Sequence, residues 1–377
     1  MIFNNEHNRP GGEDFLRRLF HHLHIDVPLL LLLMLLAGLG MVVLYSASGS
    51  NGDLIVRQVT RLSVAFIVLY LFAQIPPQLL RIWTPWLFTF GILLLIAVLA
   101  FGYTGKGAQR WLDLGLFKFQ PSEILKITVP MMVAWYLGER PLPPDFRRIT
   151  IAALIVLIPT LLIAKQPDLG TSLLIACSGF FVLFLAGLPW RLMFGAIVLM
   201  IPASMALWFY GMHAYQRQRV LTFLNPEQDP LGSGYHIIQS KIAIGSGGIY
   251  GKGWLNGTQS QLDFLPERST DFIFAVLSEE FGLVGVILLL VLYMLILLRT
   301  MHIATQAQDT FTRLLAGSLG LTFFIYVVVN TGMVTGLLPV VGLPLPLISY
   351  GGTSMVTLMA AFGILMSVHT HRKLLPK

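Results

Sequence analysis

Long apolar runs alternate with shorter polar segments along almost the whole chain. A run of about 20 apolar residues can cross a bilayer as a helix, and runs of this kind divide the chain into ten predicted spans. The predicted spans lie near residues 27–46, 58–75, 84–102, 123–137, 149–164, 170–188, 192–211, 272–298, 314–338 and 351–369. The fold class that follows is all-α, a polytopic membrane protein with ten transmembrane helices.

The longest polar segment is residues 212–270. Loops of this length are usually functional or disordered, and the apolar residues within it, among them Ile237, Ile242 and Trp254, favour an ordered loop. The predicted organisation is therefore an N-terminal tail of residues 1–25, a membrane domain of residues 26–370 that includes the loop, and a C-terminal tail of residues 371–377.

Composition agrees with a membrane protein. Of the 377 residues, 55% are hydrophobic and 11% are charged, whereas soluble domains carry about 25% charged residues. The net charge of +7 is spread over many short loops, which favours membrane topology and anionic lipid ligands over nucleic acid. The single cysteine, Cys177, lies in an apolar run, so no disulfide can form within the chain.

Basic residues flank the spans mainly on one side, which the positive-inside rule assigns to the cytoplasm. They include Arg17, Arg81, Arg147, Arg299 and Arg372. Both termini are therefore expected in the cytoplasm, and the 212–270 loop is expected in the periplasm. Several basic residues also occur in the predicted outer loops, where an anionic ligand and ordinary solvated charge explain them equally well.

Asp271 lies where the 212–270 loop enters the eighth span. A carboxylate at the mouth of a membrane helix is costly to bury, which makes it a candidate general base. Helix capping is the alternative, because Ser269, Thr270 and Asp271 are all good N-cap residues, and from position alone capping ranks first. Glu279 and Glu280 lie deeper in the same span, and at least one should face the bundle interior beside a cation.

Two further carboxylates lie at predicted helix starts. Glu123 and Lys126 are three residues apart and so share one helix face; a substrate site and a structural clamp between helices are both open. Asp168, between the fifth and sixth spans, is expected to cap the sixth, with a place in the wall of the outer site as the alternative.

Cations in the predicted outer loops complete the set of candidates. Arg110 is a guanidinium suited to a diphosphate, and Trp111 beside it is an aromatic typical of membrane interfaces. Arg217 and Arg219 open the long loop, and Lys241 lies further along it. The glycine-rich stretch 245–253 lacks the spacing of a phosphate-binding Walker loop, and no Cys/His spacing supports zinc.

Five strings make the chain recognisable: KFQPSEILK, AKQPDLGTS, GSGYHIIQSKIAIGSGG, LPERSTDFIFAVLSEEFG and LPLISYGG. Together they resemble the SEDS family of shape, elongation, division and sporulation proteins, over nearly the whole chain from about residue 25. GKGWLNGTQSQL and YQRQRV resemble the branch that serves elongation. One departure is Ser269, where the family often has His.

The resemblance implies a peptidoglycan glycosyltransferase of the inner membrane that polymerises lipid II for lateral wall growth and rod shape. It also implies a class B penicillin-binding protein as transpeptidase partner, alongside other membrane proteins of the elongation machinery. Asp271 matches the family's catalytic aspartate, and Glu123, Lys126 and Asp168 match positions that line its central cavity.

In the expected reaction Asp271 takes the proton of the acceptor's 4-hydroxyl group, and the new β-1,4 bond forms with inversion. The cations expected to hold the departing diphosphate are Arg110, Lys126, Arg217 and Arg219. A divalent ion, Mg²⁺ or Mn²⁺, is kept as an optional aid, and no other cofactor is expected. The alternative function is a lipid II flippase, which would place charges at the membrane midplane, whereas the polar residues here gather at the outer ends.

Overall fold

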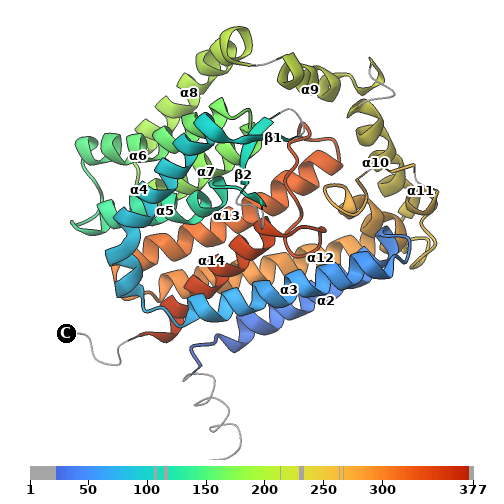
Figure 1. Ribbon diagram of the computed structural model, residues 1–377, viewed down its shortest axis with the longest axis horizontal. Coiled ribbons are helices and arrows are strands. Elements are labelled where there is room, and N and C mark those ends of the chain that lie inside the picture. The colour runs from blue at the N-terminus through green and yellow to red at the C-terminus, as the bar shows by residue number, and fades with distance from the viewer. Residues whose placement is uncertain are drawn as a thin grey trace, which may run out of the picture.

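The computed structural model describes residues 23–105, 108–113, 118–212, 214–228, 233–262, 264–265 and 267–372. Long helices packed side by side make up most of it (Figure 1). The elements before the long loop are α2 (Val27–Ala47), α3 (Gly52–Ala73), α4 (Pro77–Phe101), β1 (Tyr103–Gly105), β2 (Ala108–Asp113), β3 (Lys118–Phe119), α5 (Ser122–Gly138), α6 (Phe146–Lys165), α7 (Leu169–Leu185), α8 (Trp190–Ala206) and η1 (Leu207–Gly211). Those that follow are α9 (Ala214–Leu224), η2 (Pro226–Gln228), α10 (Ser233–Gly247), α11 (Thr258–Gln261), α12 (Ile273–Thr305), α13 (Thr310–Val334) and α14 (Thr353–Thr370).

The predicted spans coincide with helices. Eight helical stretches in the described residues are long and apolar enough to cross a membrane, with α8 and η1 forming one of them. The remaining two predicted spans coincide with α5 and α7, which have 17 residues each. The predominantly helical fold is confirmed, and the count of ten crossings stays a prediction.

One segment departs from the all-α prediction. Strands β1, β2 and β3 form a small antiparallel sheet between α4 and α5. Antiparallel strands pair through their backbones, so a short polar segment can form them without an apolar repeat. The sheet carries Arg110 and Trp111 and leads directly into α5, so it positions part of the site described below.

Polar residues start several of the helices as the sequence suggests. Asp26 accepts a hydrogen bond from Leu29 N at 2.9 Å, and Asp309 accepts one from Thr312 N at 3.0 Å. These side chains satisfy backbone N–H groups that have no partner within the helix. The eighth predicted span is different, because α12 begins at Ile273 and the N-cap position belongs to Phe272, whose side chain makes no capping bond.

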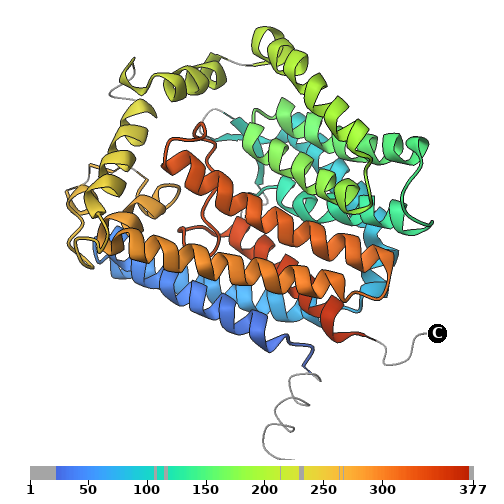
Figure 2. The same ribbon diagram turned by 180° about the vertical axis from the view of Figure 1, so that it is seen from behind.

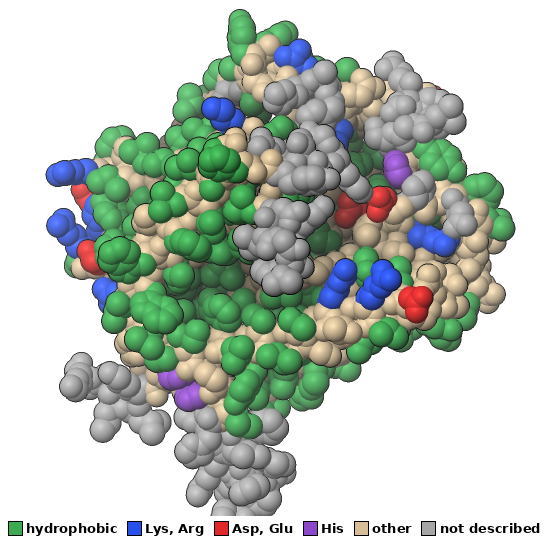
Figure 3. Space-filling view, in the orientation of Figure 1, with side chains coloured by type: hydrophobic (Ala, Val, Ile, Leu, Met, Phe, Trp, Pro, Cys, Tyr) green, Lys and Arg blue, Asp and Glu red, His purple; other side chains and the backbone are tan. Residues whose placement is uncertain are grey.

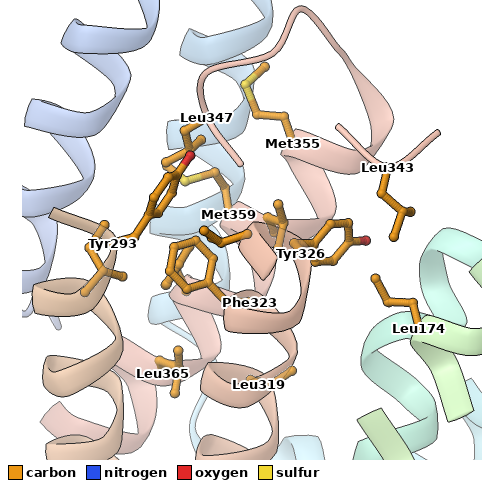
Figure 4. Packing of buried hydrophobic residues seen from close by; sticks show 14 of the residues in the cluster. Leu174, Tyr293, Leu319, Phe323, Tyr326, Leu343, Leu347, Met355, Met359 and Leu365 are labelled. Carbon is orange, nitrogen blue, oxygen red and sulfur yellow. The ribbon is translucent and has the colours of Figure 1, made fainter. Parts of the chain in front are cut away.

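The core lies where α12, α13 and α14 pack together (Figure 4). The ring of Phe323 on α13 contacts those of Tyr293 on α12 and Phe362 on α14, at 5.7 and 5.1 Å between centroids. The hydroxyl of Tyr293 donates to the carbonyl of Pro346 at 2.7 Å. These contacts fix the α13–α14 connection against the helices, and that connection forms one wall of the site.

A buried ion cluster joins three helices at one end of the bundle. Arg299 of α12 donates to both carboxylate oxygens of Asp26, which precedes α2, at 3.1 and 2.5 Å. His369 of α14 lies 3.3 Å from the same carboxylate. The start of α2 and the end of α14 therefore lie at the same end of the molecule.

The 212–270 loop is largely helical in its described part. Figures 1 and 2 both show α8, α9 and α10 as an arch around the outside of the bundle. The arch returns through α11 to the start of α12, and α10 packs against α12 and α13. The prediction of an ordered loop therefore holds for the described residues. Most of the predicted tails, residues 1–22 and 373–377, lies outside the described part.

Candidate functional site

A cavity of about 400 Å³ lies at the end of the bundle opposite the buried ion cluster. Its walls come from the β2–α5 region, the start of α7, the turn before α12 and the α13–α14 connection. These segments are far apart in sequence, and all of them fall in or beside the predicted outer loops. The residues used below are Arg110, Trp111, Glu123, Lys126, Asp168 and Asp271, together with Tyr350 and residues 341–344.

Asp271 lies in the turn of residues 267–272, one residue before the N-cap of α12. It is partly exposed and lines the cavity. Its Oδ2 faces Gly342, where an added Cβ would lie 3.5 Å away. The capping alternative is not supported, because Phe272 holds the N-cap position. The carboxylate is therefore placed to contact whatever occupies the cavity.

Glu123 and Lys126 lie on the cavity face of α5, and each side chain is more than nine-tenths buried. The ammonium of Lys126 donates to Glu123 Oε1 at 2.7 Å and lies 5.5 Å from the ring centre of Tyr326. The predicted pairing on one helix face is confirmed. The ion pair lies within α5, and the contact of Lys126 with Tyr326 links this charged site to α13.

Asp168 fulfils both alternatives considered for it. Its Oδ1 accepts from Thr171 N at 3.2 Å and so caps α7. Its Oδ2 accepts from Gln120 at 3.2 Å and lies 3.7 Å from Arg110 Nε. Arg110 also donates to the carbonyl of Pro167 at 2.6 Å. The capping carboxylate thus anchors the guanidinium at the cavity wall.

The three loop cations are placed differently. Arg219 lies outside the cavity lining and borders an apolar hollow of about 220 Å³, which shares Arg110, Asp168 and Val341 with the cavity. Arg217 donates to the carbonyl of Phe209 at 3.0 Å, and Lys241 packs over Gly336 at the end of α13. The structure brings neither of these two to the cavity, and their binding of substrate stays a prediction.

Glu279 is buried and paired, as expected for one of the two glutamates of the eighth span. Lys252 donates to it at 2.7 Å, and the backbone N–H of Gln259 donates at 3.0 Å. The stretch 248–253 runs beside a break in α12 at Gly282, where φ is 63°. Its glycines allow close approach to α12, because an added Cβ at Gly251 would lie 2.1 Å from the carbonyl oxygen of Glu280.

The α13–α14 connection was not assigned a role from the sequence, although it supplies residues 341–344 and Tyr350 to the cavity. The string LPLISYGG offered the only signal, since two glycines follow Ser349 and Tyr350 just before a helix. Arg61 of α3 lies over the ring of Tyr350, 4.4 Å from its centre. This contact extends the site to a helix that held no predicted site residue.

Charge in the cavity is mixed. Among the described residues that line it, two are cations and four are carboxylates. Figure 3 shows hydrophobic side chains over much of one face of the molecule, with acidic side chains in a recess and basic side chains beside it. A negatively charged ligand would therefore need the cations to be well oriented, and the contacts of Lys126 and Arg110 supply that orientation.

Comparison with known proteins agrees with this geometry. The peptidoglycan glycosyltransferase MrdB of Escherichia coli (strain K12) is 57% identical over 94% of this chain and 96% of its own length. The peptidoglycan glycosyltransferase RodA of Treponema pallidum (strain Nichols) is 34% identical over 92% of this chain and 98% of its own.

Solved structures are similar over the same extent. A chain from a peptidoglycan synthase complex that coordinates polymerization and crosslinking has a TM-score of 0.80 and 34% identity, covering 93% of this chain and 98% of its own. The rod shape determining protein RodA of Thermus thermophilus has a TM-score of 0.70 and 30% identity, covering 92% and 98%.

The match to a family extends over residues 27–374, which is nearly the whole chain. It takes in every helix and every cavity residue described above. The chain therefore belongs to the FtsW, RodA and SpoVE family of cell cycle proteins, the SEDS family, and is a multi-pass membrane protein.

Proposed function

We propose that this chain polymerises lipid II into glycan strands for lateral wall growth, with Asp271 as general base. Its relatives named peptidoglycan glycosyltransferases are similar over nearly the full length of both chains, and the chain is an enzyme of that kind. The main structural support for this reaction is that Asp271, Arg110 and Lys126 all line the same cavity.

The reaction is a single displacement. The 4-hydroxyl of the acceptor sugar passes its proton to the Asp271 carboxylate as its oxygen attacks C1 of the donor. The bond between C1 and the diphosphate oxygen breaks, and undecaprenyl diphosphate leaves with the bonding electrons. Attack from the opposite face converts the α-linked donor into a β-1,4-linked product, so no covalent enzyme intermediate is needed.

Lys126 and Arg110 are proposed to stabilise the charge that develops on the diphosphate. Lys126 has three N–H donors. Glu123 accepts one of them and Tyr326 is a second side-chain hydrogen-bond partner, which leaves one donor for a ligand. Arg110 is held by the carbonyl of Pro167 and by Asp168. Both cations are thus oriented before substrate arrives, which is the condition for effective electrostatic stabilisation.

A divalent ion is retained in the proposal only as a companion of the diphosphate. The described part of the chain has no group of three or more His, Cys, Asp or Glu side chains arranged to hold a metal. Carboxylates nevertheless outnumber cations in the cavity lining, so a bound diphosphate would benefit from added positive charge. Polymerisation measured with Mg²⁺, with Mn²⁺ and with EDTA would show whether the reaction requires a divalent ion.

The setting we propose is the bacterial inner membrane, with both termini in the cytoplasm and the cavity facing the periplasm. The cluster of Asp26, Arg299 and His369 supports the placement of both termini on one side, because it brings the start of α2 and the end of α14 together. We also propose a class B penicillin-binding protein as transpeptidase partner, together with other membrane proteins of the elongation machinery. The similarity to a chain of a peptidoglycan synthase complex supports such an assembly.

The test is polymerisation of labelled lipid II by the protein purified with its penicillin-binding partner, with the transpeptidase blocked. We expect long uncrosslinked glycan from the unaltered chain and none from Asp271→Ala or Asp271→Asn. Normal polymer from Asp271→Ala would refute the role of this carboxylate. Movement of lipid II across vesicles without glycan would favour the flippase instead.

A further inference from the structure

The backbone that carries Asp271 is held by three hydrogen bonds in succession. The carbonyl of Ser269 accepts from Tyr350 N at 2.8 Å, and that of Thr270 accepts from Ser349 Oγ at 2.6 Å. The carbonyl of Asp271 itself accepts from Asn330 Nδ2 at 3.0 Å. All three donors lie on α13 or on the connection between α13 and α14.

Asn330 joins two walls of the cavity. It is fully buried on α13, and its Nδ2 donates to the carbonyl of Leu343 at 2.7 Å as well as to that of Asp271. A buried amide is stabilising only when it is hydrogen-bonded, and this one directs its Nδ2 to two backbone carbonyls from different walls of the cavity. The amide therefore serves to fix the two carbonyls relative to each other.

Ser349 makes the corresponding link from the connecting loop. Its hydroxyl is buried, accepts from Leu345 N at 2.8 Å and donates to Thr270. Gln58 of α3 donates to the carbonyl of Ser349 at 3.4 Å. The loop is therefore braced by α3 on one side and holds the Asp271 turn on the other.

These bonds matter because Asp271 precedes α12 and is not part of its helical hydrogen-bonding ladder. Its backbone direction is set by neighbours from other elements. A displacement of about 1 Å in a reacting group can reduce a rate about a hundredfold, so a base on a turn depends on such restraints. Neither Asn330 nor Ser349 lines the cavity itself.

We infer that Asn330 and Ser349 are positioning residues that aim the Asp271 carboxylate at the acceptor hydroxyl. The inference rests on the proposed function of Asp271. It assigns to Ser349 of the LPLISYGG string, and to Asn330 of α13, the task of orienting the base, although neither of these two side chains lines the cavity.

The first test compares two identical substitutions in the complex with the penicillin-binding partner. Ser349→Ala removes the bond to the carbonyl of Thr270 and the acceptor of Leu345 N, whereas Ser318→Ala removes one buried bond of 2.7 Å, from α13 to the carbonyl of Ser178. We expect Ser349→Ala to lower kcat about tenfold or more with KM for lipid II nearly unchanged. Ser318→Ala should keep its kcat, and Ser349→Thr should restore most of the activity because it retains the hydroxyl.

The second test uses Asn330→Leu, which keeps the approximate size of the side chain and removes its donors. We expect it to lower kcat by about the factor seen for Ser349→Ala, in protein that still binds its partner and melts near the temperature of Ser318→Ala. This arm remains informative if Ser349→Ala fails to fold.

Two outcomes would overturn the inference: folded Ser349→Ala or Asn330→Leu with unchanged kcat, or losses in which Ser318→Ala matches Ser349→Ala. The results for Asp271→Ala distinguish failure of the proposed function from failure of this inference. If Asp271→Ala polymerises lipid II normally, the base assignment is wrong; if Asp271→Ala is inactive while the positioning variants are fully active, only the inference fails.

Discussion

The Glu123–Lys126 pair has two possible roles that a single substitution does not separate. Lys126→Ala is expected to abolish polymerisation while the protein still inserts and accumulates. However, it leaves the buried Glu123 unpaired, and an unpaired buried charge costs about 3–5 kcal/mol. A fall in protein level alone, without loss of activity in the protein that remains, would favour the structural clamp.

A double substitution removes this ambiguity. Glu123→Gln with Lys126→Met eliminates both charges and leaves neither partner alone, so near-normal accumulation is expected. Activity per folded protein should still fall about a hundredfold, because the charge that stabilises the diphosphate is gone. Quantitative glycan assays and membrane protein levels measure the two effects separately, and normal glycan from this variant would contradict a catalytic role for the pair.

Gly342 lies beside the Asp271 carboxylate, in a backbone conformation that favours glycine. Its φ is 78°, and an added Cβ would contact Asp271 Oδ2. Gly342→Ala introduces left-handed strain of about 1–2 kcal/mol at the cavity wall, so we expect about tenfold lower polymerisation. Gly187→Ala, at φ 91° between α7 and α8, applies similar strain elsewhere and should keep its activity per folded protein.

The sequence predicted cavity residues correctly where a charged side chain lies at the start of a predicted helix. Glu123, Lys126, Asp168 and Asp271 are charges at helix starts, and the cavity collects all four. Arg217 and Lys241 lie in the long loop, whose path depends on contacts that no local pattern encodes. The sequence shows that these two positions are cationic, but it does not show where their side chains lie. Arg217 contacts the backbone of Phe209, and Lys241 packs at the end of α13.

At the scale of elements, α12 is held at its break by the end of the long loop. Backbone bonds pair Lys252 and Gly253 with the carbonyls of Glu279 and Glu280, each at 3.0 Å. The Lys252–Glu279 ion pair adds a side-chain contact between the same two segments. The loop end therefore supports the helix that follows Asp271, and release of the contact should loosen α11 and the turn before α12.

Lys252→Met tests this support. It leaves Glu279 buried with only its neutral donors, so we expect a lower melting temperature and faster proteolysis within residues 250–262. Lys252→Met combined with Glu279→Gln should recover part of the loss, because no unpaired charge remains. Equal protease resistance of the single variant and the unaltered chain would show that the ion pair does not hold the loop end.

Apolar length predicted the long helices, because a membrane-spanning helix satisfies its own backbone within one continuous stretch. The strands β1 to β3 were missed, since they pair over few residues and carry no apolar repeat. The break at Gly282 was missed for another reason. It depends on the backbone of Gly248 and Ile249 bonding to Leu283 and Val284, a tertiary contact within an otherwise helical pattern.

At the scale of the whole molecule, the two ends of the bundle differ in their polar groups: one has the cavity and the other has an ionic cluster. The cavity lies at one end, as do α9 and α10, and the cluster of Asp26, Arg299 and His369 lies at the other. Along α12, the start of the helix and Arg299 are separated by 26 residues, which is about 40 Å at 1.5 Å per residue. The proposed catalytic carboxylate of Asp271 and the cluster of Asp26, Arg299 and His369 are therefore well separated.

This separation predicts that stability and catalysis can be changed independently. Arg299→Met leaves the Asp26 carboxylate buried without its guanidinium, a change that typically costs about 3–5 kcal/mol. We expect a clearly lower melting temperature and less accumulated protein, but an unchanged kcat in the fraction that is folded and bound to its partner. Asp26→Asn with Arg299→Met should recover part of the stability. A fall in kcat in the folded Arg299→Met protein would show instead that the closed end is coupled to the Asp271 turn through α12, and the division of tasks between the ends would be wrong.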